Sequence, residues 1–187
     1  MKNIILFLLS AIITGLLIAG CESENSLDNP ISTQDQFKLD SYQDGERILG
    51  KLQTELAKVR SATEKYLNIA NAIEDGYTDI NVIVKGMGYH YMKVENVDGT
   101  FDPGKPELLV YSKNPTSGKM RLVAVEYAVP NTEPLPEGFS GNEDVWVNNA
   151  DFGLWLLHAW VWYHNPDGMF NPTNPRVHVE EGEITYP

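Results

Sequence analysis

Four side chains in this sequence could form a polar site within otherwise apolar segments. His90 lies between two tyrosines, Glu126 lies in an apolar run, and His158 and Trp160 lie in the aromatic stretch 154–170. Imidazole and carboxylate groups are ligands that suit zinc, iron or manganese, and they can also act as a general acid and base. The sequence therefore predicts a ligand site at these four residues, with His90, Glu126 and His158 as candidate ligands of a divalent metal such as Zn or Fe.

The same histidines also have a structural interpretation, which the pattern favours. A lone histidine on a strand is more often a satisfied core residue than a metal ligand, and the chain contains no HExxH motif. On a strand, His158 and His164 would lie about 20 Å apart, so both cannot bind one ion. We therefore assign His164 to the turn that follows it and His178 to the surface. His90, Glu126 and His158 remain the set that would form a site if their strands converge.

Alternation along the expected strand 154–164 separates its side chains into two faces. One face carries His158, Trp160, Trp162 and His164, and the other carries Leu157, Ala159, Val161 and Tyr163. In the expected strand 121–129, the same rule places Glu126 on the face of Leu122, Ala124 and Ala128. A carboxylate among apolar side chains must point outward or have a partner, because burying it alone is costly.

A helix is the first element expected to position these residues. Apolar side chains recur at three- and four-residue spacing between residues 48 and 73, which indicates one stripe on an amphipathic helix. The stripe consists of Ile48, Leu52, Leu56, Val59, Tyr66, Ile69, Ala70 and Ile73. It weakens at residues 60–63, where Ser61 and Glu64 resemble a capping box, so a pair of helices is also compatible with the pattern. Gly76 is the expected end.

From Tyr77 onward the hydrophobic period changes to two, which is typical of strands. Strands are expected at residues 89–94, 108–112, 121–129 and 154–164, with short strands at 144–148 and 177–179. Hairpin-length connections favour antiparallel pairing, and residues 130–144 form a long acidic loop. The predicted fold class is α+β, with an N-terminal amphipathic helix or helix pair packed on a mostly antiparallel sheet.

The N-terminus has the pattern of an exported protein. A lysine precedes the apolar run Ile4–Ala19, and the segment Leu17–Cys21 resembles the lipobox of bacterial lipoproteins. The resemblance implies cleavage before Cys21, with lipid on its sulfur and its new amino group. A retained transmembrane helix is the alternative, but this run is near the lower limit for a span. Cys21 is the only cysteine in the chain, so its lipidation would leave no thiol for a disulfide or for catalysis.

The chain is expected to contain one folded domain. Residues 1–20 are interpreted as the lipoprotein signal peptide, 21–43 as a flexible tether and 44–187 as a single α+β domain. The formal net charge of −12 argues against nucleic-acid binding. Membrane attachment would therefore come from the lipid on Cys21, and Glu22 resembles a sorting residue that favours the outer membrane of a diderm cell envelope.

Three motifs together resemble a family of bacterial exported proteins for which no activity is established. They are Gly86–Tyr91, Val125–Tyr127 and His158–Phe170, of the forms GMGxHY, VEY and HxWxWxHNPxGxF. The resemblance covers about residues 63–177 and implies a single compact domain, but it assigns no catalytic residue.

The combined interpretation is a lipid-anchored envelope protein with a small-ligand or metal-binding pocket. Two alternatives stay open at this point. One is a metal-dependent or acid/base, hydrolase-like enzyme acting on envelope material, and the other is a structural or interaction module without a small-molecule site. The residues alone do not decide whether the protein is an enzyme.

Overall fold

The computed structural model describes residues 32–186. The expected signal peptide, Cys21 and the tether up to residue 31 lie outside the described residues. The chain divides into two units, residues 1–38 and 39–187. Of the first unit, residues 32–38 are described, and they include the start of helix α1 (Thr33–Thr63). Within the described range, no helix combines the length and apolarity needed to cross a membrane.

Helix α1 begins earlier than the sequence pattern predicts. Residues 33–43, expected as part of the flexible tether, are helical. They contain no glycine or proline, and most are adequate helix formers, so the backbone can continue the helix without an apolar stripe. All side chains from residue 39 to 50 are exposed, and packing begins at Leu52. Ile48, assigned to the apolar stripe, is therefore outside the core.

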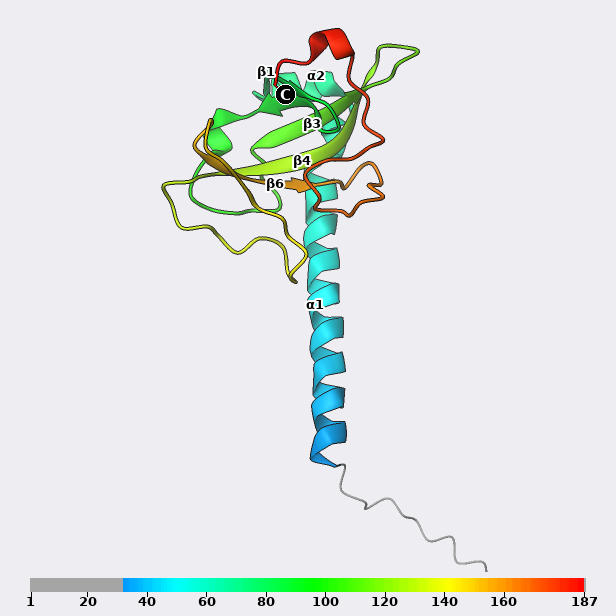
Figure 1. Cartoon of the computed structure of the whole chain (residues 1–187), viewed down its shortest axis with the longest axis vertical. Helices are drawn as coiled ribbons and strands as arrows, with labels where there is room; N and C mark the ends of the chain where they lie inside the picture. Colours follow the sequence, from blue (N-terminus) through cyan, green and yellow to red (C-terminus); the bar gives the residue numbers. More distant parts are fainter. Residues whose placement is uncertain (1–31, 187) are drawn as a thin grey trace, which may run out of the picture. The chain divides into compact units, whose positions relative to one another are not determined.

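The expected antiparallel sheet is present, so the α+β class is confirmed (Figure 1). Six strands pair in the order β1-β2-β3-β4-β6-β5, and every neighbouring pair is antiparallel. The strands are β1 (Thr78–Val84), β2 (Gly88–Met92), β3 (Leu108–Lys113), β4 (Met120–Pro130), β5 (Val147–Asn149) and β6 (Leu154–Ala159). The short 3₁₀ helix η2 (Val94–Asn96) lies between β2 and β3, and η3 (Glu181–Glu183) lies in the segment after β6.

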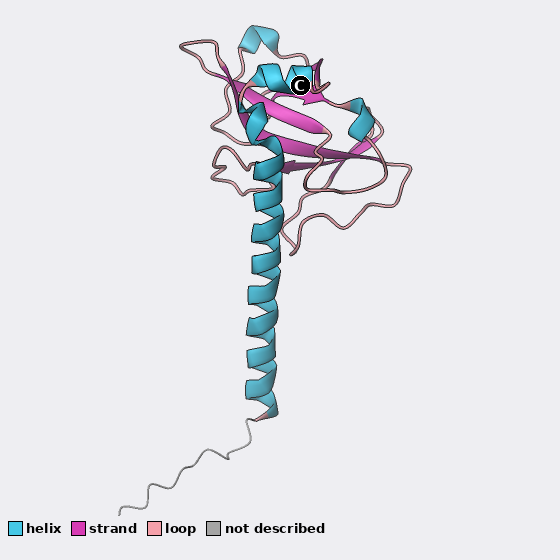
Figure 2. Ribbon diagram, turned by 180° about the vertical axis from the view of Figure 1, so that it is seen from behind, coloured by secondary structure: helices cyan, strands magenta, loops and turns pink. Residues whose placement is uncertain are grey.

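Helical elements cover one face of the sheet. After α1 the chain forms the 3₁₀ helix η1 (Glu64–Leu67) and helix α2 (Ile69–Glu74) (Figure 2). The chain therefore has the alternative arrangement of two helices, but the interruption lies at residues 64–68 and not at 60–63. The cap of α2 is Asn68, whose side chain accepts from the Ala70 amide, and not the expected Ser61. One cluster buries side chains of these helices against the sheet: Leu56, Val59, Tyr66 and Ala72 with Leu109, Tyr111, Leu122, Val125, Tyr127 and Leu157.

A bulge in β4 changes the predicted face of Leu122. Val110 pairs with Ala124 and Tyr111 pairs with Leu122, so Val123 has no partner of its own in β3. Beyond such a bulge, alternation is shifted by one residue. Leu122 therefore joins the cluster on the helical face, while Glu126 lies on the opposite face with Ala124.

The predicted strand 154–164 is too long, because β6 ends at Ala159. The Trp160 amide donates to the carbonyl of Met169, outside the β4 ladder. Trp160 then packs beside Val123, whereas Trp162 packs with the helical cluster and donates to the Thr63 hydroxyl at 3.0 Å. The two tryptophans therefore do not share one strand face.

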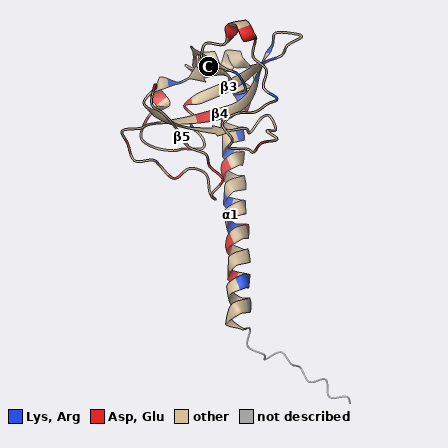
Figure 3. Cartoon of the chain, viewed as in Figure 1, with Lys and Arg blue, Asp and Glu red and all other residues tan. Residues whose placement is uncertain are grey.

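The predicted edge strand 177–179 is not a strand, although the segment lies against the end of β3. The His178 carbonyl accepts from the Lys113 amide at 3.1 Å. Charged side chains are spread along α1 and the connections, and Glu126 is the one acidic residue of β4 (Figure 3).

Candidate metal centre

Strand pairing places His90, Glu126 and His158 on the sheet face opposite the helices. Glu126 of β4 lies directly across from His158 of β6, and its other neighbour is Leu108 of β3. His90 lies on β2, across from Val110 of the same β3 strand. Because alternate residues of a strand share a face, Leu108 and Val110 point the same way, and His90 reaches toward Glu126 across β3.

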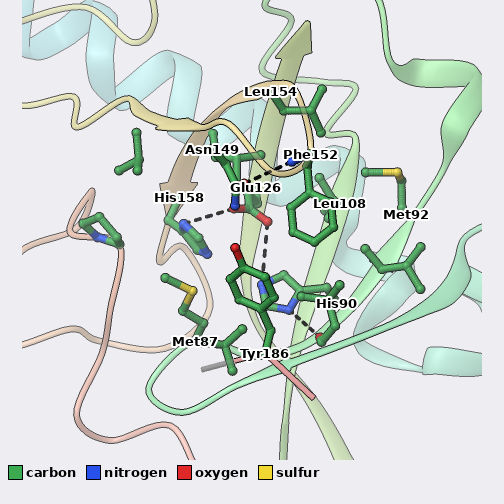
Figure 4. A pocket seen from close by; sticks show the side chains of 16 residues that line it. Met87, His90, Met92, Leu108, Glu126, Asn149, Phe152, Leu154, His158 and Tyr186 are labelled. Carbon is green, nitrogen blue, oxygen red and sulfur yellow. Dashed lines mark hydrogen bonds and ion pairs between the residues drawn. The ribbon is translucent and has the colours of Figure 1, made fainter. Parts of the chain in front are cut away.

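The three side chains form a compact buried cluster. His90 Nε2 is 3.7 Å from Glu126 Oε2, and His158 Nδ1 is 3.4 Å from Glu126 Oε1. Figure 4 shows the carboxylate between the two imidazoles. One donor atom from each residue lies within 4.8 Å of the other two. Ligands bound at 2.0–2.1 Å to a tetrahedral ion are about 3.4 Å apart. The two distances from the carboxylate to the imidazoles are close to this value, and the wider spacing of up to 4.8 Å would have to close when an ion binds.

The orientation of His90 is fixed by a bulge in β1. Asp79 pairs with Tyr91 and Ile83 pairs with Tyr89, so residues 80–82 lie opposite the single residue His90. The carbonyl of Val82 in this bulge accepts a hydrogen bond from His90 Nδ1 at 2.8 Å. A carbonyl oxygen can only accept, so the neutral ring is protonated on Nδ1 and keeps a lone pair on Nε2. Metal-binding histidines have this outer hydrogen bond.

His158 has a different environment. Its ring stacks on Trp160 with centroids 5.8 Å apart, and the residue is only 3% exposed. Its Nε2 atom is buried and has no hydrogen-bond partner among the described residues. An unpaired polar atom in a protein interior is costly. The arrangement is therefore suited to an additional ligand or a bound water at this histidine.

Burial dominates the electrostatics of the cluster. It raises the pKa of Glu126 to about 8, with a further contribution from the charge of Glu107. Burial also lowers the pKa of His158 to about 3, helped by His90, and lowers the pKa of His90. The residues are close enough for ion pairs, but at neutral pH two neutral imidazoles face a protonated carboxyl group. A bound cation would reverse this preference by stabilising the carboxylate.

The cluster lies in the wall of an apolar cavity of about 150 Å³. Side chains from all six strands line it, together with Phe152, Pro172 and Tyr186. Most of the lining is aliphatic, including Val82, Val84 and Leu156. The cavity is therefore suited to a small molecule with a mostly apolar body.

The remaining histidines and Trp160 do not contribute to this cavity. Trp160 supports the His158 ring from outside the lining, and its indole N–H donates to the Asn171 carbonyl at 2.6 Å. His164 is exposed, and its backbone carbonyl accepts from the Asn174 side chain at 3.4 Å. The His178 side chain is 42% exposed.

Several residues of the site were not identified from the sequence. Alternation of Ile80, Val82 and Val84 could have indicated the cavity wall on β1. Tyr186 and Phe152 reach it through long-range packing, with ring centroids 5.5 Å apart, and no local pattern marks them. Glu107, only 2% exposed, is a second buried carboxyl that the pattern did not single out.

Comparison with known proteins gives no match: no family model, curated protein or solved structure matches the chain. The chemistry of the cluster and its cavity therefore carries the functional argument.

Proposed function

We propose that this protein binds one divalent transition-metal ion through His90, Glu126 and His158. The observation that carries the proposal is the convergence of three buried donor atoms within 4.8 Å of one another. The hydrogen bond from His90 to Val82 adds the outer support that such ligands need. Two imidazoles and one carboxylate suit zinc or iron(II), and leave further coordination positions open.

Elemental analysis of the full chain tests the metal site. The protein is purified in detergent without chelator and dialysed against zinc, and separately handled without oxygen with iron(II). We expect about one equivalent of metal in the wild-type chain. The double variant His90→Ala/His158→Ala should lose it, whereas the matched control His164→Ala/His178→Ala should keep it. Equal metal content in both variants would show that surface groups account for the binding.

We also propose that the chain is a lipid-anchored envelope protein attached through Cys21. The support is the Leu17–Cys21 segment and the position of the single cysteine. In a diderm host, radiolabelled palmitate should enter the wild-type chain and move with the outer-membrane fraction, and Cys21→Ser should abolish labelling. Labelling that persists in Cys21→Ser would contradict the anchor.

A metal-dependent, hydrolase-like enzyme is the second candidate. The observation favouring it is that all three ligand residues line the cavity, so an open coordination position would be accessible to a substrate and a water. A zinc-bound water has a pKa near 7 and is a nucleophile at neutral pH. Hydrolysis of small activated esters by the zinc-loaded chain, lost in His90→Ala/His158→Ala, would support turnover. Metal binding without turnover would favour the binding function alone.

A further inference from the structure

The cavity next to the cluster combines an apolar wall with very few polar groups. Apart from His90, Glu126 and His158, only Asn149 and Tyr186 contribute polar side chains to its lining. The Tyr186 hydroxyl is already used, because it donates to Asp151 at 2.6 Å. The side chain of Asn149 is also engaged, because its oxygen accepts from the Phe152 amide at 3.2 Å and its amide group interacts with the Tyr186 hydroxyl. Specific recognition of a polar group in the cavity therefore depends mainly on the cluster.

The charge of the loaded cluster selects the sign of that polar group. A divalent cation with two neutral imidazoles and the carboxylate of Glu126 has a net charge of +1. None of the described residues lining the cavity is Lys, Arg or Asp, and Glu126 is the single Glu. A buried charge without a partner is costly. A ligand with one negative charge neutralises the site, whereas a cationic ligand adds repulsion.

The size of the cavity selects the body of the ligand. Its volume of about 150 Å³ is comparable with apolar cavities that hold a benzene molecule. The wall on β1 and β6 offers Val82, Val84, Leu154 and Leu156, which supply dispersion contacts but no hydrogen bonds. The half-exposed ring of Phe152 lies at the same cavity (Figure 4).

We propose that this cavity binds a small monoanionic molecule with an apolar body, of the class of aromatic or short-chain carboxylates. The carboxylate is the group that ligates the metal ion, and the body lies against the aliphatic wall of β1 and β6. This inference rests on the metal site proposed above. It adds a ligand class, defined by one negative charge and a body of about benzene size.

A cobalt-loaded sample of the full chain in detergent tests the ligand class. Cobalt(II) occupies zinc-type sites, and its visible bands change when a ligand enters the coordination sphere. Benzoate is titrated first, followed by acetate, which has the same head without the body, and benzyl alcohol, which has the body without the charge. We expect benzoate to bind at least about tenfold more tightly than acetate, because its ring is removed from water. Benzyl alcohol should leave the cobalt bands unchanged.

A pair of tryptophan substitutions tests the location. Leu154→Trp places a bulky ring at a half-buried position of the wall and should weaken benzoate binding about tenfold or more, with cobalt content and acetate affinity unchanged. Leu135→Trp, the same change at an exposed loop position, should have no effect.

The two proposals fail in different ways. If no cobalt binds, the metal site and the ligand class are both overturned. If cobalt binds but benzoate and acetate bind equally, or Leu154→Trp does not affect benzoate, the ligand class alone is overturned. Benzoate affinity that is higher than that of acetate and sensitive to Leu154→Trp supports the inference.

Discussion

Glu126 is a carboxyl group placed where a negative charge is costly. It is 2% exposed, and the ring nitrogens of His90 and His158 lie 3.7 and 3.4 Å from its carboxylate oxygens. These distances are longer than those of ordinary hydrogen bonds, so the three groups support one another weakly in the absence of a ligand. A divalent ion would supply the interaction that the groups do not make among themselves.

The substitution Glu126→Gln tests this role through stability. Glutamine keeps the shape of the side chain and has no negative charge. At pH 7 we therefore expect the unfolding free energy of the metal-free variant to lie within about 1 kcal/mol of the wild-type value. Zinc at 100 times its dissociation constant should stabilise the wild-type chain by about 2.7 kcal/mol, and should stabilise the variant much less. Thermal unfolding with chelator and with zinc measures both values.

His178→Ala is the control for Glu126→Gln and should keep the full zinc effect. Equal stabilisation of wild type and Glu126→Gln by zinc would show that Glu126 is not a ligand.

The β1 bulge is the element that orients His90. Asn81 within it has φ +54, a left-handed conformation that asparagine tolerates better than most residues. The C-terminal segment holds the bulge: the Thr185 hydroxyl donates to the Asn81 carbonyl at 2.5 Å and accepts from the Ile83 amide at 2.9 Å. These two hydrogen bonds of Thr185 flank Val82, whose carbonyl accepts from His90.

Replacing Thr185 should destabilise the β1 bulge. Thr185→Val keeps the shape of the side chain but removes two hydrogen bonds, and we expect a loss of about 1 kcal/mol at this exposed position. Hydrogen exchange of the Ile83 amide should become faster, and zinc affinity should fall because His90 is less well oriented. Thr132→Val, at an exposed loop position, is the control. An unchanged exchange rate at Ile83 would show that the Thr185 hydroxyl does not stabilise the bulge.

The elements also show why only part of the site could be predicted. His90, Glu126 and His158 could be identified because each is a polar residue inside an apolar segment, and each segment is a strand paired with its neighbours. Period-two alternation was right for Trp160, which stacks on His158, and wrong for Trp162, which packs with the cluster on the helical face. The Trp160 indole donates to the Asn171 carbonyl, and the Trp162 indole donates to the hydroxyl of Thr63, which is 99 residues away in the sequence. No pattern local to Trp162 predicts a contact over that separation.

The bulges were missed for the same physical reason. An extra residue at Val123 and the irregular segment 80–82 depend on pairing with neighbouring strands, and they leave no local pattern. Likewise, the walls supplied by Phe152 and Tyr186 require the folded arrangement. Sequence spacing could therefore predict the polar cluster and the cavity wall on β1, but not the walls that Phe152 and Tyr186 supply.

For the whole molecule, buried titratable groups determine how stability depends on pH. Burial raises the pKa of Glu107 and of Glu126 to about 8 and that of Asp144 to about 6. The folded state therefore keeps protons that the unfolded state releases above its ordinary carboxyl pKa, and these groups make stability fall as pH rises. Burial lowers the pKa of His90 and His158. Below the unfolded-state histidine pKa of about 6.5, the unfolded chain therefore binds protons that the folded chain does not, and these two groups make stability fall as pH falls.

Below about pH 6.5 the buried histidines and the buried carboxyl groups change the unfolding free energy in opposite directions. Above about pH 6.5 only the buried carboxyl groups still make it depend on pH. We expect the unfolding free energy of the metal-free chain to fall between about pH 6.5 and 8, by up to about 1.4 kcal/mol per pH unit for each of Glu107 and Glu126. Chemical denaturation with chelator at several pH values measures this slope. Glu107→Gln should roughly halve this slope, because it removes one of the two titrating carboxyl groups. The glutamine oxygen can still accept from the Ala128 amide, which donates to Glu107 at 3.1 Å in the wild-type chain, so the local structure should be kept. Stability that is constant or rises over this range would mean that these carboxyl groups are already ionised in the folded protein.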